Sequence, residues 1–201
     1  MTGCVLLVGM LAYIDHSHWQ VLRSCRQKDF VQTQDITKYH CQVFTVVKVI
    51  DGDTLDINIP DKRYPTTRVR LLGIDTPETQ KDGEAPMYFG PEAAEFTRKL
   101  ALSRKVKVMI DTISPSRDKY DRLLCYLELP DGRILNEVLI EEGFAYADLR
   151  FKHSLFETYR NIQDRACDNR KGLWEDVTPD QLPIWLRRKR PDLTAAYQEQ
   201  N

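Results

Sequence analysis

Hydrophobic and polar positions alternate with a period of two in several short stretches of the chain. Leu55, Ile57 and Ile59 alternate with polar residues, which is typical of a strand with one buried face. Other apolar runs are rich in β-branched residues and are bounded by Gly, Pro or Asp turn signals, so they predict further strands. The predicted strands cover residues 43–50, 55–59, 69–74, 106–110 and 123–129.

Three other segments carry apolar residues at helical spacing. Pro91 and Glu92 suit the first turn of a helix, and Ser154 is expected to cap the last one. The predicted helices cover residues 90–100, 135–143 and 154–172. The predicted order along the chain is three strands, a helix, two strands and two helices. This order predicts a small five-stranded β-barrel with flanking helices, which is an α+β fold.

The character of the chain changes at two points. Residues 1–41 show no sustained hydrophobic period after an apolar start and are expected to be an N-terminal extension. Residues 42–176 hold every predicted strand and helix and are expected to form one domain. Residues 177–201 contain three prolines and the basic run 187–190, which predicts a loosely attached C-terminal arm. The basic run is either solvated or in contact with nucleic acid, anionic lipid or a protein.

Composition and charge are ordinary for a globular protein. Of the 201 residues, 42% are hydrophobic and 29% are charged, and the formal net charge is −1. A protein that binds nucleic acid over an extended surface is usually more basic than this. A nucleic-acid ligand is therefore expected to contact a small, local positive site. The alternative is that the net charge says nothing about binding, because it can hide a basic patch. Five cysteines without paired spacing argue against a disulfide framework and a zinc site.

The segment from Cys4 to Ile14 has the length of a signal-peptide core. No Lys or Arg precedes it, and the next basic residue is Arg23. Secretion, a short element that packs on the domain, and a mis-assigned start all remain open, so the compartment is not assigned. No segment is long and apolar enough to span a bilayer, and nothing in the sequence requires more than a monomer.

Acidic and arginine side chains in three short blocks suit phosphodiester chemistry. Asp53 and Asp75 lie at the ends of predicted strands, where side chains converge at a barrel mouth, and carboxylates with backbone carbonyls suit Ca²⁺ or Mg²⁺. Glu78 follows three residues after Asp75, where it can accept a proton from an attacking water. Arg70 and Arg122 can hold phosphate oxygens and neutralise the charge that builds up during hydrolysis.

Each of these residues also has an ordinary structural explanation. Asp51 and Asp53 can simply form turns, and Glu78 can be a solvated acid. Arginines in strands commonly form surface salt bridges, and Arg63, Arg68 and Arg117 are assigned to that role. The three blocks taken together, in this order along the chain, favour the catalytic interpretation.

These blocks resemble the staphylococcal nuclease (thermonuclease) family. The resemblance covers residues 43–176, and its carriers are residues 50–54, 70–79, 90–94, 118–122, 136–139 with Gly143, and 172–174. It implies a five-stranded OB-fold barrel with three flanking helices. It also implies a metal-dependent endonuclease that hydrolyses DNA and RNA with Ca²⁺ or another hard divalent cation and leaves 3′-phosphate ends.

The resemblance implies a role for each matching position. Asp53, Asp75 and the backbone carbonyl of Thr76 would bind the metal, with Asp51 as a supporting acid beside them. The family's three catalytic positions correspond to Arg70, Glu78 and Arg122. Glu78 would be the general base.

Substrate contacts depart from the family pattern in part. Tyr120 matches a tyrosine that lines the nucleotide pocket, and Lys81 lies in a flanking loop where it could meet the substrate backbone. Leu149 and Phe151 occupy positions where tyrosines contact the nucleotide. Base stacking could continue through Phe151 or Tyr146, whereas Leu149 has no hydroxyl for a phosphate hydrogen bond.

Asp121 is a second departure, because a glycine usually precedes the catalytic arginine at this point. Glycine there would permit a positive φ, which aspartate tolerates at a modest cost. The negative charge of Asp121 next to Arg122 would also weaken phosphate affinity.

Two other functions compete with a nuclease. An inactive nuclease-like module that binds nucleic acid or a protein would be expected to lose its metal acids or arginines, and all of them are present. A phosphatase of the haloacid dehalogenase type shares the Asp-x-Asp of residues 51–53. It would need Thr or Val in place of Leu55, a later pair of adjacent Asp residues and alternating βα units, which the chain lacks.

Overall fold

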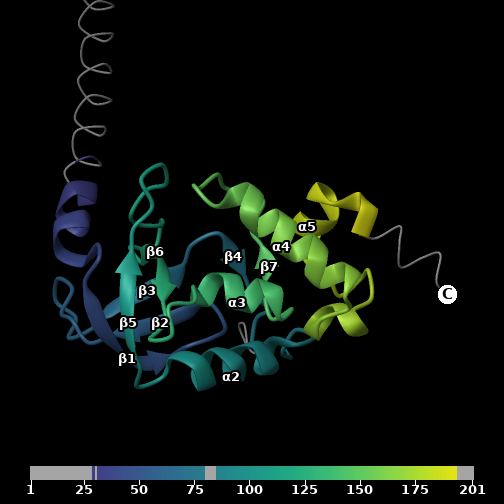
Figure 1. Ribbon diagram of the computed structural model, residues 1–201, viewed down its shortest axis with the longest axis horizontal. Helices are drawn as coiled ribbons and strands as arrows, with labels where there is room; N and C mark the ends of the chain where they lie inside the picture. The colour runs from purple at the N-terminus through teal and green to yellow at the C-terminus, as the bar shows by residue number, and fades with distance from the viewer. Residues whose placement is uncertain (1–28, 30, 80–84, 194–201) are drawn as a thin grey trace, which may run out of the picture.

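Five strands close into a barrel in the order β1-β2-β3-β6-β5, with helices beside it (Figure 1). The computed structural model describes residue 29 and residues 31–79 and 85–193. The barrel strands are β1 Val43–Val49, β2 Thr54–Ile57, β3 Thr67–Leu71, β5 Lys105–Met109 and β6 Leu123–Glu128. This arrangement confirms the predicted five-stranded barrel and the α+β fold class.

The inside of the barrel is filled by aliphatic side chains from every strand. One fully buried residue from each strand in turn is Val46, Leu55, Val69, Val106 and Leu123. Neighbouring strands are antiparallel except β3 and β6, which run parallel. Burial of this apolar surface is the main driving force for closing the barrel.

The strand predicted over residues 69–74 is interrupted. β3 ends at Leu71, and Gly73 adopts a left-handed φ of 77°, which turns the chain before the short strand β4, Ile74–Asp75. β4 leaves the barrel and pairs with β7, Tyr146–Ala147, as a separate two-stranded sheet. The alternation of apolar residues predicted one strand because it carries no information about the turn at Gly73.

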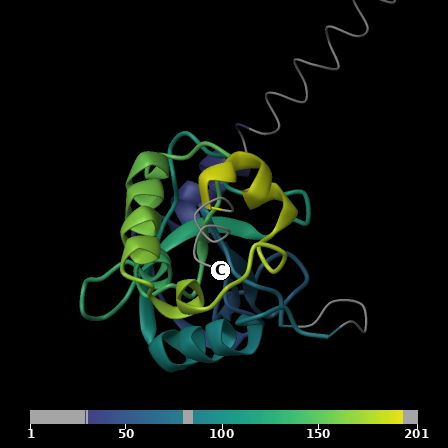
Figure 2. The same ribbon diagram turned by 90° about the vertical axis from the view of Figure 1, so that its right-hand side faces the viewer.

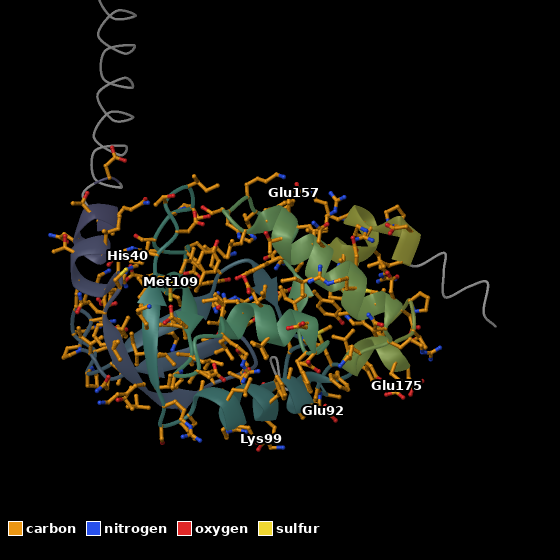
Figure 3. The ribbon with its side chains drawn as sticks, viewed as in Figure 1. His40, Glu92, Lys99, Met109, Glu157 and Glu175 are labelled. Atoms are coloured by element: carbon orange, nitrogen blue, oxygen red, sulfur yellow. The ribbon has the colours of Figure 1, made fainter. Side chains whose placement is uncertain are left out.

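The three expected helices are present as α2 Gly90–Ala101, α3 Leu135–Glu141 and α4 Phe156–Asp168. Pro91 lies in the first turn of α2, as its fixed φ predicts. Glu92 and Lys99 lie on the outer side of this helix, away from the barrel, while its alanines face inward (Figure 3). The prediction that Ser154 caps α4 is wrong, because Leu155 occupies that position without a side-chain cap.

Segments on both sides of residues 42–176 pack against the barrel domain. Residues 31–39 are helical, and Tyr39 at the end of this helix is fully buried and hydrogen-bonded to Thr67 over 3.1 Å. Part of the expected N-terminal extension is therefore packed against the barrel. The boundary at residue 41 stays a prediction.

The C-terminal segment is also packed, rather than loosely attached as expected. Leu182 and Leu186, the latter in α5, Ile184–Lys189, are buried in a second apolar cluster with Trp174 of the 3₁₀ helix η1, Gly172–Glu175. α4 and α5 lie at the end of the molecule opposite the helix of residues 31–39 (Figure 1, Figure 2). The boundary at residue 176 stays a prediction.

No helix in the described ranges has the length and hydrophobicity needed to cross a membrane. The signal-like segment, residues 4–14, lies outside the described residues.

Candidate active site

The turn between β1 and β2 places Asp53 against the second block. Asp51 accepts the backbone N–H of Asp53 through Oδ1 over 3.1 Å, which closes the turn. A Cβ on Gly52 would lie 2.7 Å from the side chain of Thr76, so only glycine lets the two segments approach this closely. Asp53 is 1% exposed, and its Oδ2 accepts the backbone N–H of Thr76 over 3.0 Å. The β1–β2 turn and the segment after β4 are therefore packed directly against each other and hydrogen-bonded.

Arg70 lies between the two carboxylates that were predicted to bind metal. Its Nη1 forms an ion pair with Oδ1 of Asp53, and its Nη2 donates to Oδ1 of Asp75 over 2.6 Å. The side chain of Arg70 is 16% exposed, so these contacts are sheltered from water. One oxygen from each carboxylate thus faces a shared cationic group.

The residues at this position fit a hard cation. Asp53 and Asp75 offer carboxylate oxygens to a shared position that a positive group, Arg70, already occupies. Thr76 follows directly, and oxygen ligands alone are what Ca²⁺ and Mg²⁺ prefer. No cluster of three or more His, Cys, Asp or Glu side chains is arranged to hold a metal in the described part of the chain. Water and a phosphate would have to complete the coordination.

Asp51 differs in character from these two acids. Burial raises the pKa of Asp51 above its usual range, and the nearby Arg70, Thr54 and Arg122 lower it only in part. Its Oδ1 already accepts a hydrogen bond inside the turn. Asp51 therefore supports the turn, and the role beside the metal that the resemblance implies for it stays a prediction.

Arg122 is brought to the same place by the third block. Asp118 accepts the backbone N–H of Arg122 over 3.0 Å and its Nε–H over 2.7 Å, which fixes the guanidinium. Nη1 of Arg122 contacts Oγ1 of Thr54 at 3.4 Å, and this hydroxyl donates to Oδ1 of Asp53 over 3.0 Å. Arg122 is thus linked to Asp53 through a single side chain, and all three sequence blocks converge.

Tyr120 and Asp121 lie beside Arg122 in the same loop. The ring of Tyr120 is 67% exposed, and its centroid lies 5.4 Å from the Arg122 guanidinium. Asp121 has a φ of 66°, which agrees with the interpretation that this position requires the left-handed region. Its carboxylate forms an exposed ion pair with Lys62.

Glu78 lies just beyond the metal candidates, after Pro77. Its backbone carbonyl accepts the N–H of Met87 over 3.0 Å, which ties it to the chain that leads into α2. The side chain is exposed to solvent, where a water and a substrate could both reach it. This exposure is compatible with a proton acceptor in the free protein.

The residues predicted to contact the substrate differ in how far they are exposed to solvent. Phe151 is 66% exposed and free to meet a base, with the Arg150 guanidinium 5.8 Å from its ring centre. Tyr146 is 1% exposed and packs edge-on against Trp174, so it cannot stack on a nucleotide. Leu149 is buried. The predicted contact from Lys81 falls outside the described residues.

Two residues that touch Asp75 were not identified from the sequence. Nε1 of Trp185 donates to Oδ2 of Asp75 over 2.9 Å, and Nη2 of Arg150 lies 3.2 Å from the same oxygen. Arg150 stands between Leu149 and Phe151, the two positions that the resemblance assigns to nucleotide contacts, and no motif marks Arg150 itself. Trp185 lies beyond the segment that resembles the family, and no motif pointed to it.

Other arginines near the site have structural partners. Arg117 pairs with Asp35 in the helix of residues 31–39 and with Asp61. Arg68 pairs with Asp56 across β2 and β3 at 2.8 Å. Arg68 thus forms the surface salt bridge assigned to it, whereas the Arg117 pairs are largely buried, with 10% of its side chain exposed. Arg63 instead donates to the hydroxyl of Tyr64 over 3.0 Å.

The closed barrel, with acidic and arginine side chains gathered beside the β1–β2 turn, places this chain among α+β proteins that carry a charged site on an OB-fold barrel. Comparison with known proteins identifies the family. The family described as staphylococcal nuclease homologue matches residues 68–176. This chain therefore belongs to the staphylococcal nuclease family, which is a family of nucleases.

Individual relatives support this assignment. A thermonuclease of Staphylococcus intermedius is 40% identical over 144 residues, which cover 72% of this chain and 76% of that protein. A thermonuclease of Staphylococcus hyicus is 34% identical over 136 residues, with 67% and 77% covered. An uncharacterised endonuclease of Escherichia coli O157:H7 is 30% identical over 151 residues, with 72% and 84% covered.

Proposed function

We propose that this protein is a metal-dependent endonuclease that hydrolyses phosphodiester bonds in DNA and RNA and leaves 3′-phosphate ends. The observation that carries the proposal is the position of Arg70 between Asp53 and Asp75, with Arg122 linked to Asp53 through Thr54. Relatives described as thermonucleases and as an endonuclease support the same reaction. Ca²⁺ is the proposed cofactor, because the donor set consists of oxygens.

Asp53, Asp75 and the carbonyl of Thr76 would hold the cation. When bound, Ca²⁺ would polarise the phosphate and neutralise part of its charge. Arg70 would then turn from the carboxylates to the phosphate oxygens, because the cation takes over its role between them. A guanidinium suits this exchange, since it stays charged and binds carboxylates and phosphates with the same fork geometry.

Glu78 would accept the proton of the attacking water. The water oxygen forms a bond to phosphorus while the bond from phosphorus to the 5′-oxygen breaks, and the departing oxygen takes a proton from solvent. The phosphate stays on the 3′ side of the cut. Arg70 and Arg122 would stabilise the charge that develops on the phosphoryl oxygens, which is the largest contribution expected from fixed side chains.

Substrate would approach over the exposed rings of Tyr120 and Phe151. Aromatic faces stack on any base, so they support cleavage of single strands with little sequence preference. The guanidinium of Arg122 beside Tyr120 would hold the adjacent phosphate.

The test is digestion of single-stranded DNA and of RNA in Ca²⁺ by the wild type and by an Arg70→Ala Glu78→Gln double variant. The expected result is cleavage by the wild type, with products that a 3′-phosphatase converts to 3′-hydroxyl ends, and no cleavage by the double variant. Arg68→Ala is the matched control, because Arg68 lies in the same strand but pairs with Asp56.

Cleavage by Arg68→Ala should match the wild type. Products with 3′-hydroxyl ends, or undiminished cleavage by the double variant, would refute the proposed chemistry. Tight binding of DNA by the wild type without any cleavage would instead identify an inactive binding module, and Asp121 and Leu149 would then be the first residues to test as the cause of the lost cleavage.

A further inference from the structure

The two oxygens of Asp75 face different partners. Oδ1 faces the position shared with Asp53, where Arg70 donates to it over 2.6 Å. Oδ2 faces away and accepts the indole N–H of Trp185 over 2.9 Å, with Arg150 at 3.2 Å. A carboxylate held through one oxygen keeps a fixed orientation, so the other oxygen stays directed at the cation position.

Trp185 comes from a part of the chain outside the family match. The match ends at residue 176, and Trp185 lies in α5. Its ring packs edge-on against Tyr146 in β7, and the Arg150 guanidinium lies 4.6 Å from its centre. The indole is therefore fixed on two sides by residues of the neighbouring sheet and loop.

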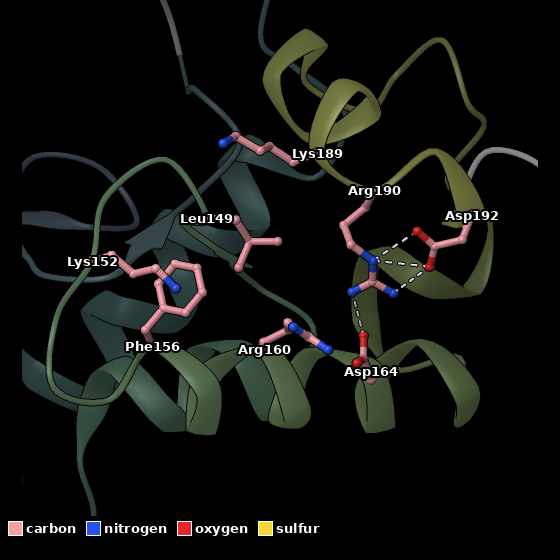
Figure 4. A pocket seen from close by; sticks show the side chains of 8 residues that line it. All are labelled: Leu149, Lys152, Phe156, Arg160, Asp164, Lys189, Arg190 and Asp192. Atoms are coloured by element: carbon pink, nitrogen blue, oxygen red, sulfur yellow. Dashed lines mark hydrogen bonds and ion pairs between the residues drawn. The ribbon is translucent and has the colours of Figure 1, made fainter.

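α5 itself is anchored to the domain. Leu182 and Leu186 are buried against the second apolar cluster. Arg190 forms ion pairs with Asp164 of α4 at 2.7 Å and with Asp192 at 2.6 Å (Figure 4). These pairs lie along a groove of about 530 Å³ between α4 and residues 189–192. The anchored helix can hold Trp185 in place against Asp75.

We propose that the C-terminal segment, residues 182–193, completes the cation site and that Trp185 is the positioning residue for Asp75. The indole N–H orients the carboxylate without adding a full positive charge, whereas Arg150 also repels a cation. Cation binding and docking of this segment then stabilise one another, since such coupling is reciprocal. This inference rests on the proposed cation site at Asp53 and Asp75.

Trp185→Phe tests the inference, because phenylalanine keeps a smaller aromatic ring at this position and removes the N–H donor. Calorimetric titration with Ca²⁺, without nucleic acid, should give a dissociation constant about 10-fold higher than in the wild type. Ile184→Ala is the control, since Ile184 is exposed on the same helix and should bind Ca²⁺ as the wild type does. Asp75→Asn should bind far more weakly than either.

The outcomes separate the inference from the proposed function. Unchanged Ca²⁺ affinity in Trp185→Phe, with loss of affinity in Asp75→Asn, would overturn the positioning role alone. A wild type that binds no Ca²⁺, or binds it equally well after Asp75→Asn, would overturn both. If Trp185→Phe does not fold, hydrogen exchange in the wild type decides. Ca²⁺ should slow exchange across residues 182–193, and unchanged exchange there would contradict the coupling.

Discussion

The two arginines of the site are held by different kinds of partner. Arg70 bridges the two acids that are proposed to hold the cation, so we expect its ion pairs to open when metal and substrate bind. Arg122 is fixed by Asp118, which has no other proposed role in the reaction, so its position is set before substrate arrives. A pre-organised guanidinium needs little rearrangement to stabilise a transition state.

Substitution of Arg122 should therefore affect the chemical step more than binding. We expect Arg122→Ala to lower kcat by about 10²- to 10³-fold. Arg122→Lys should recover little of this loss, because an ammonium group cannot make the paired contacts of a guanidinium. Single-turnover cleavage of labelled DNA at saturating protein measures the effect. A kcat in Arg122→Ala within a factor of about two of the wild type would remove Arg122 from the site.

Asp121 carries both a backbone strain and a charge. Asp121→Gly should raise the free energy of unfolding by up to about 1 kcal/mol, because glycine accepts the φ of 66° without a Cβ penalty. It should also lower KM for DNA, since a negative charge beside Arg122 is removed. Urea unfolding and steady-state cleavage measure the two effects.

Asp121→Asn separates these contributions, because asparagine also tolerates a positive φ but has no charge. It should lower KM as Asp121→Gly does and leave stability near that of the wild type. An unchanged KM in both variants would show that this charge has no influence on substrate binding.

Residues in contiguous blocks could be predicted from the sequence, whereas contacts between distant segments could not. Asp53, Asp75, Arg70 and Arg122 lie within short blocks whose residue types suggest their chemistry, and the fold brings them together. Trp185 is separated from Asp75 by 110 positions, so nothing in the local pattern indicates their contact.

At the scale of elements, the break between β3 and β4 controls the position of Asp75. Gly73 turns the chain so that β4 leaves the barrel and pairs with β7. The periodicity identified the barrel strands, because each buries one face in a common core. It could not show the break, since the left-handed φ of Gly73 leaves no trace in the hydrophobic pattern.

Gly73→Ala should disturb this junction. A Cβ there would lie 2.5 Å from the ring of His153, and alanine would also be strained at a φ of 77°. His153 cannot move easily, because it is buried and hydrogen-bonded to Tyr126 over 2.9 Å. We expect a loss of about 1–3 kcal/mol in the free energy of unfolding and weaker Ca²⁺ binding.

Urea unfolding and calorimetry would measure these changes in Gly73→Ala. Gly132→Ala is the control, since Gly132 has a similar φ but nothing within 4 Å of the added Cβ, so it isolates the backbone strain. Equal losses of stability in the two variants would show that contact with His153 is unimportant. Unchanged Ca²⁺ affinity in Gly73→Ala would show that the turn at Gly73 does not influence the proposed cation site.

Asp111, a buried carboxylate in the segment after β5, connects β6 with the segment that leads into α4. Asp111 accepts hydrogen bonds from the backbone N–H of Ser114, from the hydroxyl of Tyr126 and from the backbone N–H of Ser154, which precedes α4, each at 2.8 Å. Burial alone would raise the pKa of Asp111, but the bonds from Ser154, Tyr126 and Ser114 outweigh it and lower the pKa to about 2. The ionised form therefore stabilises the folded protein.

This group should make the protein sensitive to acid. The folded pKa of about 2 lies below the usual 3.8, so the stabilisation is complete above about pH 4 and is lost as the pH falls toward 2. Asp111→Asn should lower the free energy of unfolding at pH 7 by about 2 kcal/mol and flatten its decline below pH 4. Urea unfolding across pH 2–7 tests this, with the exposed Glu95→Gln as control. An equally steep decline in Asp111→Asn would contradict the assignment.

At this scale the sequence predicted the barrel and its three helices but not the packing of the two ends. The barrel is encoded by repeated local patterns, whereas Tyr39 and Trp185 hold the two ends in place through contacts with residues far away in the sequence. Such contacts depend on the finished fold, and a short helix such as α5 has too few residues to show a period.

The most direct test of the proposed cation-dependent site is the rate of single-stranded DNA cleavage in Ca²⁺, in Mg²⁺ and in chelator, measured for the wild type and Asp53→Asn. We predict that the wild type cuts in Ca²⁺, stops in chelator and recovers when Ca²⁺ is restored. Asp53→Asn should not recover at the same Ca²⁺ concentration. Cleavage that continues in chelator, or that is unaffected by Asp53→Asn, would contradict a cation held by Asp53 and Asp75.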